Sequence, residues 1–390
     1  MPIPTNPQQP VSRSLLAACC AAFFILGMAG AMVGPAKDAV VEALGMPIER
    51  GGLLVSAQFV GATAGVYLGG WLSDRTDMRV VLCGGGLLMA LGLVLFGVSS
   101  SFALFVVAEA VMGLGMGGWA AGPNIIFAKA GLKRPSVGLN LLNGTWGIGS
   151  ALGPQLVDSA LNQGRLALGY YSAAAVAALL LPVFWRMPLR LGDSHAVGYA
   201  RPEGWRPYLP FALMFTAYVG AETGFGAWVY TQLTAAGKAP ITQGALAASL
   251  FWAGLTLGRM AAAVLLRHVR ERSLLSACAM ILAVGSMTMV LFPQATSWAV
   301  VVSLIIGLGC GPIFPTTYGW VVRSVPATSG ATLATLQAVG TFGAVLVPPV
   351  QGYVGGGRDG GMIVVAALGA ALAWLFARAA RKPRAQPRAA

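Results

Sequence analysis

The chain contains a series of apolar segments, each about twenty residues or longer, separated mostly by short polar breaks. An α-helix of roughly 20 apolar residues spans the hydrocarbon core of a bilayer, which is about 30 Å thick. The sequence therefore predicts an all-α membrane protein with twelve transmembrane helices. These helices are expected near 14–34, 50–73, 79–99, 101–128, 136–160, 166–187, 206–233, 242–266, 273–293, 296–322, 328–353 and 360–379.

The composition supports this class. Hydrophobic residues make up 57% of the chain and charged residues only 9%, whereas a soluble domain carries roughly 25% charged residues. The first apolar segment is too long for a usual signal-peptide core and lacks a clear small-x-small cleavage site, so we expect it to be retained as the first helix.

The one long polar interruption lies at 188–205 and contains Arg190, Asp193, His195, Arg201 and Glu203. It divides the chain into a six-helix N-terminal bundle, 1–187, and a six-helix C-terminal bundle with a basic tail, 206–390. We expect 188–205 to be a cytoplasmic linker between them.

Positive charges predict the topology. When the loops are numbered alternately, most of the 25 lysines and arginines fall on one side. The other side receives only Lys37, Arg50, Arg165, Lys238 and Arg358. Since cytoplasmic loops retain Lys and Arg, we expect a multi-pass protein of the cell inner membrane with both termini cytoplasmic. Basic loops beside anionic lipid explain the net charge of +13, so membrane lipids and not nucleic acid are the expected partners. We expect the protein to be a monomer.

The chain also repeats itself. Gly61–Gly65 matches Gly254–Gly258, and Gly113–Gly117 matches Gly307–Gly311, at offsets of 193 and 194 residues. Further matches at the second offset are Leu142 with Leu336, Asn143 with Gln337, Gly149 with Gly343 and Pro154 with Pro348. The pattern indicates duplication of a six-helix unit, with two pseudo-symmetric halves related by an axis along the membrane normal.

The predicted loop after the second helix reads Gly70-Trp71-Leu72-Ser73-Asp74-Arg75-Thr76-Asp77-Met78-Arg79. It resembles the Gly-x-Leu-x-Asp-Arg-x-Gly-Arg-Lys/Arg loop of the major facilitator superfamily, with departures at Asp77 and Met78. The resemblance implies transport by alternating access and a cytoplasmic latch formed by Gly70, Asp74, Arg75 and Arg79. Asp74 would pair with Arg79 or a helix N-terminus in one conformation only. The alternative is a topogenic loop of mixed charge.

A closer branch is also indicated. Tyr218–Glu222, followed by Gly224, Gly226, Ala227 and Trp228, resembles the fucose-permease-like branch of bacterial sugar symporters. The segments Gly254–Arg259 and Leu141–Pro154 fit the same branch. That branch often has an acidic residue near the position where this chain has Trp119 and Ala120, so its proton coupling need not transfer.

Three ionisable side chains lie well inside predicted helices, where they are costly and usually mark function. Glu222 lies near the middle of its span, Arg259 toward the cytoplasmic side and Glu109 toward the outer side. We expect Glu222 to couple transport to protons, with Glu109 as the next candidate. Arg259 could bind a solute carboxylate or hydroxyl, or pair with Glu222. For each residue the alternative is a structural contact between helices.

Aromatic faces and amides could line a solute path, since amides bind hydroxyl groups as donors and acceptors. The candidates are Gln58, Trp119, Asn124, Asn140, Asn143, Trp146, Trp228, Trp252 and Gln337. Asn143 and Gln337 are favoured because they occupy equivalent positions in the two halves. Interfacial anchoring or helix–helix hydrogen bonding is the alternative.

No enzyme is indicated. The two histidines, His195 and His268, fall in predicted loops without a catalytic triad or a metal cluster, and no nucleotide-binding loop of the GxxxxGK[ST] type occurs. Gly113–Gly118 satisfies G-x-G-x-x-G but lies inside an apolar helix, where close helix packing explains it better. We therefore expect no cofactor and no metal. The predicted function is proton-coupled secondary transport of a small sugar-like or carboxylate solute; a proton-coupled efflux pump, a passive facilitator and a non-transporting receptor are the alternatives.

Overall fold

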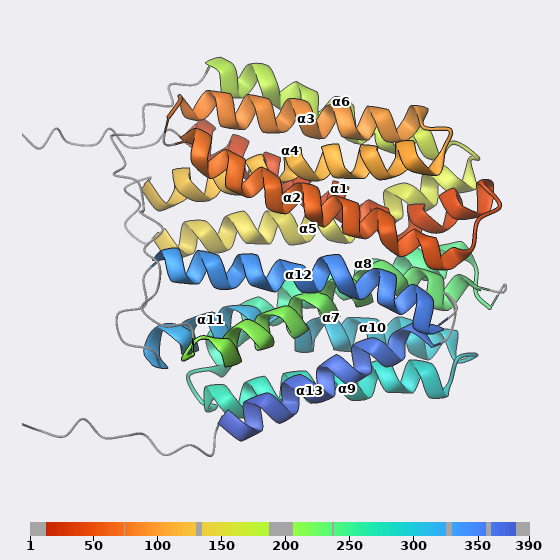
Figure 1. Ribbon diagram of the computed structural model, residues 1–390, viewed down its shortest axis with the longest axis vertical. Coiled ribbons are helices and arrows are strands. Elements are labelled where there is room, and N and C mark those ends of the chain that lie inside the picture. Colours follow the sequence, from red (N-terminus) through yellow and green to blue (C-terminus); the bar gives the residue numbers. More distant parts are fainter. Residues whose placement is uncertain are drawn as a thin grey trace, which may run out of the picture.

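The computed structural model describes residues 13–73, 75–129, 135–186, 206–235, 238–324, 330–355 and 360–379. Its helices lie side by side in one bundle (Figure 1). They are α1 (Arg13–Ala43), η1 (Ile48–Gly51), α2 (Gly52–Ser73), α3 (Met78–Val98), α4 (Phe102–Lys129), α5 (Pro135–Asn162), α6 (Leu166–Arg186), α7 (Leu209–Thr234), α8 (Ile241–Leu265), α9 (Glu271–Leu291), α10 (Thr296–Cys310), α11 (Ile313–Ser324), α12 (Gly330–Gly355) and α13 (Gly361–Ala379).

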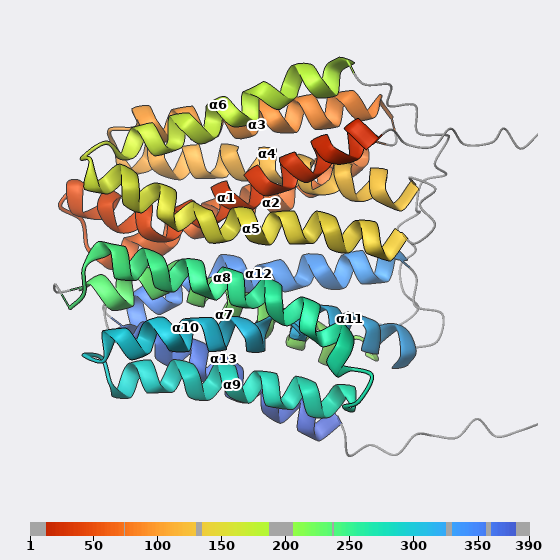
Figure 2. The ribbon, with the colours of Figure 1, turned by 180° about the vertical axis from the view of Figure 1, so that it is seen from behind.

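The helices form two halves, α1–α6 and α7–α13, which occupy the two ends of the long axis (Figures 1 and 2). Within the N-terminal half the closest pairs are α2 with α4, α1 with α5 and α3 with α4; α7 with α12, α8 with α10 and α9 with α13 form the C-terminal half. The halves meet mainly through α5 with α8, α2 with α12 and α1 with α7. The fold is thus the predicted all-α membrane protein of two six-helix halves.

The described residues contain nine spans that are long and apolar enough to cross a membrane. The other three long helices, α5, α7 and α12, each contact the opposite half. Large apolar side chains such as Leu87 and Leu91 on α3 and Leu179 on α6 are half exposed or more. Such surfaces suit contact with lipid, whereas the less apolar helices lie where the halves meet.

The glycine motifs of the internal repeat make equivalent contacts in both halves. A Cβ at Gly113 of α4 would overlap the Gln58 carbonyl of α2, and a Cβ at Gly307 of α10 would overlap the Phe251 carbonyl of α8. The second pair repeats the first at the offset read from the sequence. Small residues let these helices approach backbone to backbone, so the G-x-G-x-x-G match serves packing.

A second pair of equivalent contacts joins other helices. Gly149 on α5 packs against the Phe24 backbone of α1, and Gly343 on α12 packs against the Thr216 backbone of α7. Here too a Cβ would overlap a carbonyl oxygen of the facing helix. The predicted duplication therefore describes three-dimensional contacts as well as sequence.

Two helix boundaries differ from the expectation. α1 continues to Ala43 with Pro35 inside it, about nine residues beyond the predicted end. The predicted helix 296–322 is divided into α10 and α11 near Pro312. Proline disfavours a helical conformation in the residue before it and cannot donate the helical hydrogen bond, yet only one of these two prolines interrupts its helix.

Candidate functional site

The bundle has two ends that differ in charge. We call the end where α1, α3, α5 and α7 begin the basic face, because exposed arginines gather there, and the end where they finish the opposite face. The exposed arginines of the basic face include Arg75, Arg186, Arg206, Arg267 and Arg270.

At the opposite face the two halves are in contact. Lys37 near the end of α1 is fully buried, and its ammonium contacts the Thr231 hydroxyl of α7 at 2.5 Å. Gln155 of α5 donates a hydrogen bond to Ser249 of α8 at 3.2 Å. On the other side of the bundle Ser56 of α2 donates to the Val345 carbonyl of α12 at 2.5 Å. All three pairs of facing helices are therefore closed here.

Contacts between the halves continue about halfway along the helices. On α2 and α12, Thr63 donates to Thr341 at 3.3 Å. On α5 and α8, Gly147 lies directly against the Thr256 side chain, so that a Cβ at Gly147 would overlap it.

One turn closer to the basic face the facing surfaces become exposed. Asn143 lies four residues before Gly147 on α5, and Gln337 lies four residues before Thr341 on α12, so each is on the helix side that faces the other half. Both are exposed. The sequence-predicted equivalent pair therefore lies on exposed helix surfaces, closer to the basic face than the contacts between the halves.

An ion pair lies near the level where the halves part. Arg259 of α8 and Glu222 of α7 face each other, with Nη2 of the arginine 3.5 Å from Oε1 of the glutamate. The side chains are 27% and 13% exposed. The Arg259 Nε is buried and has no hydrogen-bond partner among the described residues. The structure thus brings together the two residues whose pairing the sequence left open.

Aromatic residues from both halves surround this pair. The Arg259 guanidinium lies over the Trp146 ring of α5, 5.7 Å from its centroid. Trp146 meets Trp252 of α8 edge to face at 5.5 Å. Arg259, Glu222, Trp146 and Trp252 form the cluster that we call the central site. It offers a cation, a carboxylate and aromatic faces, which together suit a small polar organic solute.

Other sequence candidates lie elsewhere. Trp119 is fully buried and donates to the Leu82 carbonyl at 2.7 Å, inside the N-terminal half. Trp228 is 2% exposed, donates to the Pro348 carbonyl and carries Lys37 over its ring. Neither contacts an open surface in this conformation. The side chains of Asn124 and Asn140 lie outside the described residues.

Glu109 is also separate from the central site. It is fully buried within the N-terminal half, and in the part of the chain that the structure describes neither carboxyl oxygen has a hydrogen-bond partner. Tyr170 of α6, whose hydroxyl is likewise unpartnered, lies near enough to interact with its charge. Its role in proton coupling stays a prediction.

The predicted latch is described only in part. Asp74 lies outside the described residues. Arg75 stacks on Trp71 of its own segment, 4.3 Å from the ring centroid. Asp77 accepts the Arg79 backbone N–H at 2.9 Å as the N-cap of α3, and its carboxylate lies 3.9 Å from the Arg79 Nε. The departure from the superfamily pattern at Asp77 thus supplies a helix cap.

Sequence analysis missed Lys37. It was counted among loop cations on the outer side, whereas the structure buries it inside α1 between the halves. The equivalent contacts of Phe24 and Thr216 relate α1 to α7 at an offset of 192 residues, so the counterpart of Lys37 is Val229, and the repeat gave no signal for a contact with Thr231.

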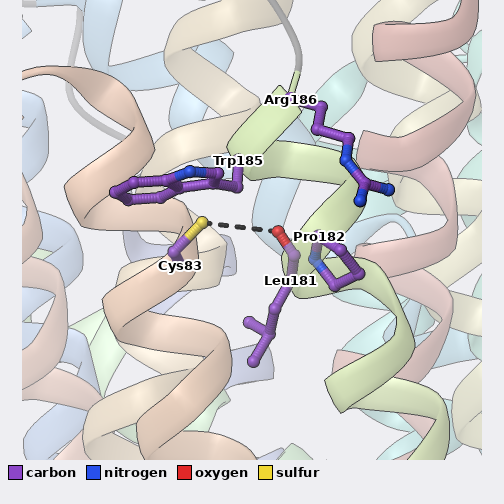
Figure 3. A pocket seen from close by; sticks show the side chains of 5 residues that line it. All are labelled: Cys83, Leu181, Pro182, Trp185 and Arg186. Atoms are coloured by element: carbon purple, nitrogen blue, oxygen red, sulfur yellow. Dashed lines mark hydrogen bonds between the residues drawn. The ribbon is translucent and has the colours of Figure 1, made fainter.

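A cavity of about 300 Å³ opens on the side of the N-terminal half, between α3 and α6 (Figure 3). It is lined by Cys83, Leu181, Pro182, Trp185 and Arg186. The Cys83 thiol points at the Leu181 carbonyl, 3.6 Å away. Since both helices belong to one half, this cavity is distinct from the central site.

Comparison with known proteins decides the family. The model of the Major Facilitator Superfamily matches residues 19–236, more than half of the chain. The chain belongs to the Major Facilitator Superfamily. Among curated proteins, an uncharacterised MFS-type transporter of Yersinia pestis is 22% identical over 339 residues, covering 85% of this chain and 87% of that protein. An arabinose-proton symporter of Bacillus subtilis is 27% identical over 124 residues, which cover 30% of this chain and 27% of that protein.

Solved structures agree on the superfamily fold. The nucleoside transporter NupG superposes with a TM-score of 0.76 at 15% identity, covering 95% of this chain and all of that one. A bacterial homologue of the human lysosomal transporter Spinster, in an inward-facing and occupied conformation, also gives 0.76, at 13% identity and with 96% and 98% coverage. These likenesses show that the chain shares the fold of these two proteins.

Proposed function

We propose that this superfamily member is a proton-coupled secondary transporter that carries a small sugar-like or carboxylate solute across the inner membrane by alternating access. The observation that carries the proposal is the Arg259–Glu222 pair at the boundary between the halves. Charged side chains inside a membrane protein are costly. Arg259 and Glu222 must therefore either stay paired with each other or be satisfied in another way, Arg259 by a ligand and Glu222 by a proton.

The chemistry follows from the groups present. A solute carboxylate or hydroxyl binds the planar guanidinium of Arg259 as an acceptor, while an apolar or ring-shaped part packs on Trp146. When the solute takes over Arg259, the Glu222 carboxylate loses its cation. A desolvated carboxyl without a cation favours the protonated form, so solute and proton bind together.

Access alternates when the halves rock about the central site. In this proposal the described conformation gives access to the site from the basic face, which the distribution of cations predicts to be cytoplasmic. Asn143 and Gln337 lie on the exposed route to it and would offer hydrogen bonds to solute hydroxyls. In this proposal the linker 188–205 and both termini are cytoplasmic, and Gly70, Asp74, Arg75 and Arg79 form the latch that holds the other state.

The sugar-like arm of the proposal draws on two likenesses. One is the resemblance of Tyr218–Glu222 to the fucose-permease-like branch. The other is the partial match to a protein named as an arabinose-proton symporter. The carboxylate arm draws on Arg259 alone. A screen of sugars and organic acids for thermal stabilisation of the purified protein would separate the arms and supply the ligand.

Transport is tested in proteoliposomes containing the full chain and the ligand found in that screen. We expect counterflow of labelled solute and accumulation driven by an imposed pH gradient, acid outside. Accumulation only under the reversed gradient would identify an exporter. Counterflow without any effect of the gradient would identify a passive facilitator, and binding without counterflow a receptor.

A further inference from the structure

The buried contact of Lys37 joins α1 to α7 across the boundary between the halves. The ammonium lies 2.5 Å from Asp38 Oδ1 on its own helix and 2.5 Å from the Thr231 Oγ1 on the facing helix. It also lies over the Trp228 ring, 3.8 Å from the centroid. Thr231 and Trp228 lie one turn apart on α7, so both of the facing partners belong to the C-terminal half.

Thr231 connects all three polar groups. Its hydroxyl accepts a hydrogen bond from Lys37 and donates one to Asp38 at 2.9 Å. A hydroxyl has one donor and two acceptor sites, so a single side chain of α7 satisfies both charges of α1. Thr231 is 1% exposed and Lys37 is fully buried.

The backbones meet directly beside this cluster. A Cβ at Gly34 of α1 would lie 3.0 Å from the Gly226 carbonyl of α7. At the same face Gly52 of α2 abuts the Pro348 carbonyl of α12, and Gly352 of α12 abuts the Glu49 carbonyl of η1. The Lys37 cluster is therefore part of a continuous closed seam.

We propose that Lys37, Asp38, Thr231 and Trp228 form a lock that holds the opposite face closed. The lock opens when the contact with Thr231 is lost. When the halves separate at this face, Lys37 keeps Asp38 beside it but loses Thr231 and Trp228 and gains water. Removing the ammonium from water is costly, so the closed arrangement is stable only while Thr231 and Trp228 of α7 take the place of that water. The closed arrangement and the open, hydrated arrangement of Lys37 therefore compete in free energy.

The role of the lock in transport rests on the proposed alternating access. The closed state that the lock stabilises is measured without any solute. Spin labels at Gln163 and Thr242, exposed residues of opposite halves, report separation at the opposite face. Labels at Thr76 and His268, also exposed, report the basic face. Both pairs are introduced into the full chain after its native cysteines are replaced, and distances are measured by electron–electron double resonance in lipid nanodiscs.

Thr231→Val keeps the shape of the side chain and removes the hydroxyl that serves both charges. We expect the population with a long distance at the opposite face to rise about tenfold relative to the closed one, which corresponds to about 1.4 kcal/mol. Thr231→Ser should stay closed, because it retains the hydroxyl. Thr234→Val is the matched control, since the Thr234 hydroxyl donates to the Tyr230 carbonyl of its own helix.

Lys37→Met is a second test that leaves Thr231 unchanged. Without the ammonium, the Asp38 carboxylate keeps one partner at the closed seam and is better hydrated when the face opens, so we expect this variant to open as well. An unchanged closed distance in folded Thr231→Val and Lys37→Met overturns the lock. If both variants open while the parent protein transports no solute, the lock stands and the proposed transport function falls.

Discussion

Arg259 and Glu222 meet at the level where the two halves part, with Nη2 and Oε1 3.5 Å apart. They come from adjacent helices of one half, while the ring over which Arg259 lies belongs to Trp146 of the other half. The arrangement places a partly exposed ion pair where any relative movement of the halves changes its surroundings.

The first prediction concerns solute binding. Arg259→Lys keeps the positive charge but loses the planar fork that holds a carboxylate or a pair of hydroxyls. We expect solute affinity to fall about tenfold or more, measured by calorimetry with the ligand found in the stabilisation screen. Arg267→Lys, at an exposed position of the basic face, should leave affinity unchanged. Normal affinity in a folded Arg259→Lys protein would leave Arg259 with a structural role only.

The second prediction concerns proton coupling. Glu222→Gln imitates the protonated carboxyl, so it removes the step in which a proton is released. Accumulation driven by a pH gradient should be lost, while exchange of labelled for unlabelled solute should continue, because exchange needs no net movement of protons.

Both activities are measured in the same proteoliposomes, with Glu42→Gln, at an exposed position of α1, as the control. If Glu222→Gln still accumulates solute in response to the pH gradient, the coupling residue lies elsewhere. Glu109 would then be tested in the same way.

The third prediction concerns the latch in the segment after α2. Asp74→Asn keeps the size of the side chain and removes its charge, so it should shift the equilibrium between the two open states by about 1–3 kcal/mol without unfolding the protein. Spin-label distances at the basic face measure the shift. Asp77→Ala separates the latch from the helix cap, because it removes the oxygen that accepts the Arg79 N–H and should lower the stability of α3 while leaving that equilibrium in place. Unchanged distances in Asp74→Asn would contradict the latch.

The fourth prediction concerns the packing of the repeated motifs. Gly113→Ala introduces a Cβ that overlaps the Gln58 carbonyl, so α2 and α4 must separate, and stability should fall by about 1–3 kcal/mol. Gly84→Ala is the matched control, because a Cβ there meets no described residue within 4 Å and alanine favours the helix. Thermal unfolding in detergent should give a lower Tm for Gly113→Ala and an equal or higher one for Gly84→Ala. Equal Tm values for the two variants would refute the packing role.

The sequence was sufficient to predict the helices and the two halves, because both depend on repeated local patterns. The length of an apolar segment predicts a span, and the match of Gly113–Gly117 with Gly307–Gly311 predicts the duplicated helix pair. The position of Glu222 and Arg259 inside apolar segments made them candidates for function, and the structure shows that they pair. Their distance was not predictable, because it depends on how α7 and α8 are rotated about their axes.

The prediction was wrong for Lys37, where two local patterns misled. Gly34 and Pro35 resemble the end of a helix, yet α1 continues past them because its neighbours pack closely around it. A cation near the predicted end of a span was then counted as a loop residue. Charge counting does not distinguish a lysine in water from one that is buried against the facing half.

The contact between Lys37 and Thr231 also shows how far the two halves have diverged. Phe24 and Thr216 make equivalent contacts with Gly149 and Gly343, so α1 corresponds to α7 at an offset of 192 residues in this region. The counterpart of Lys37 is therefore Val229, and the counterpart of Asp38 is Tyr230. Both charges of the closed seam come from the N-terminal half, and the copy of this segment in the C-terminal half carries neither.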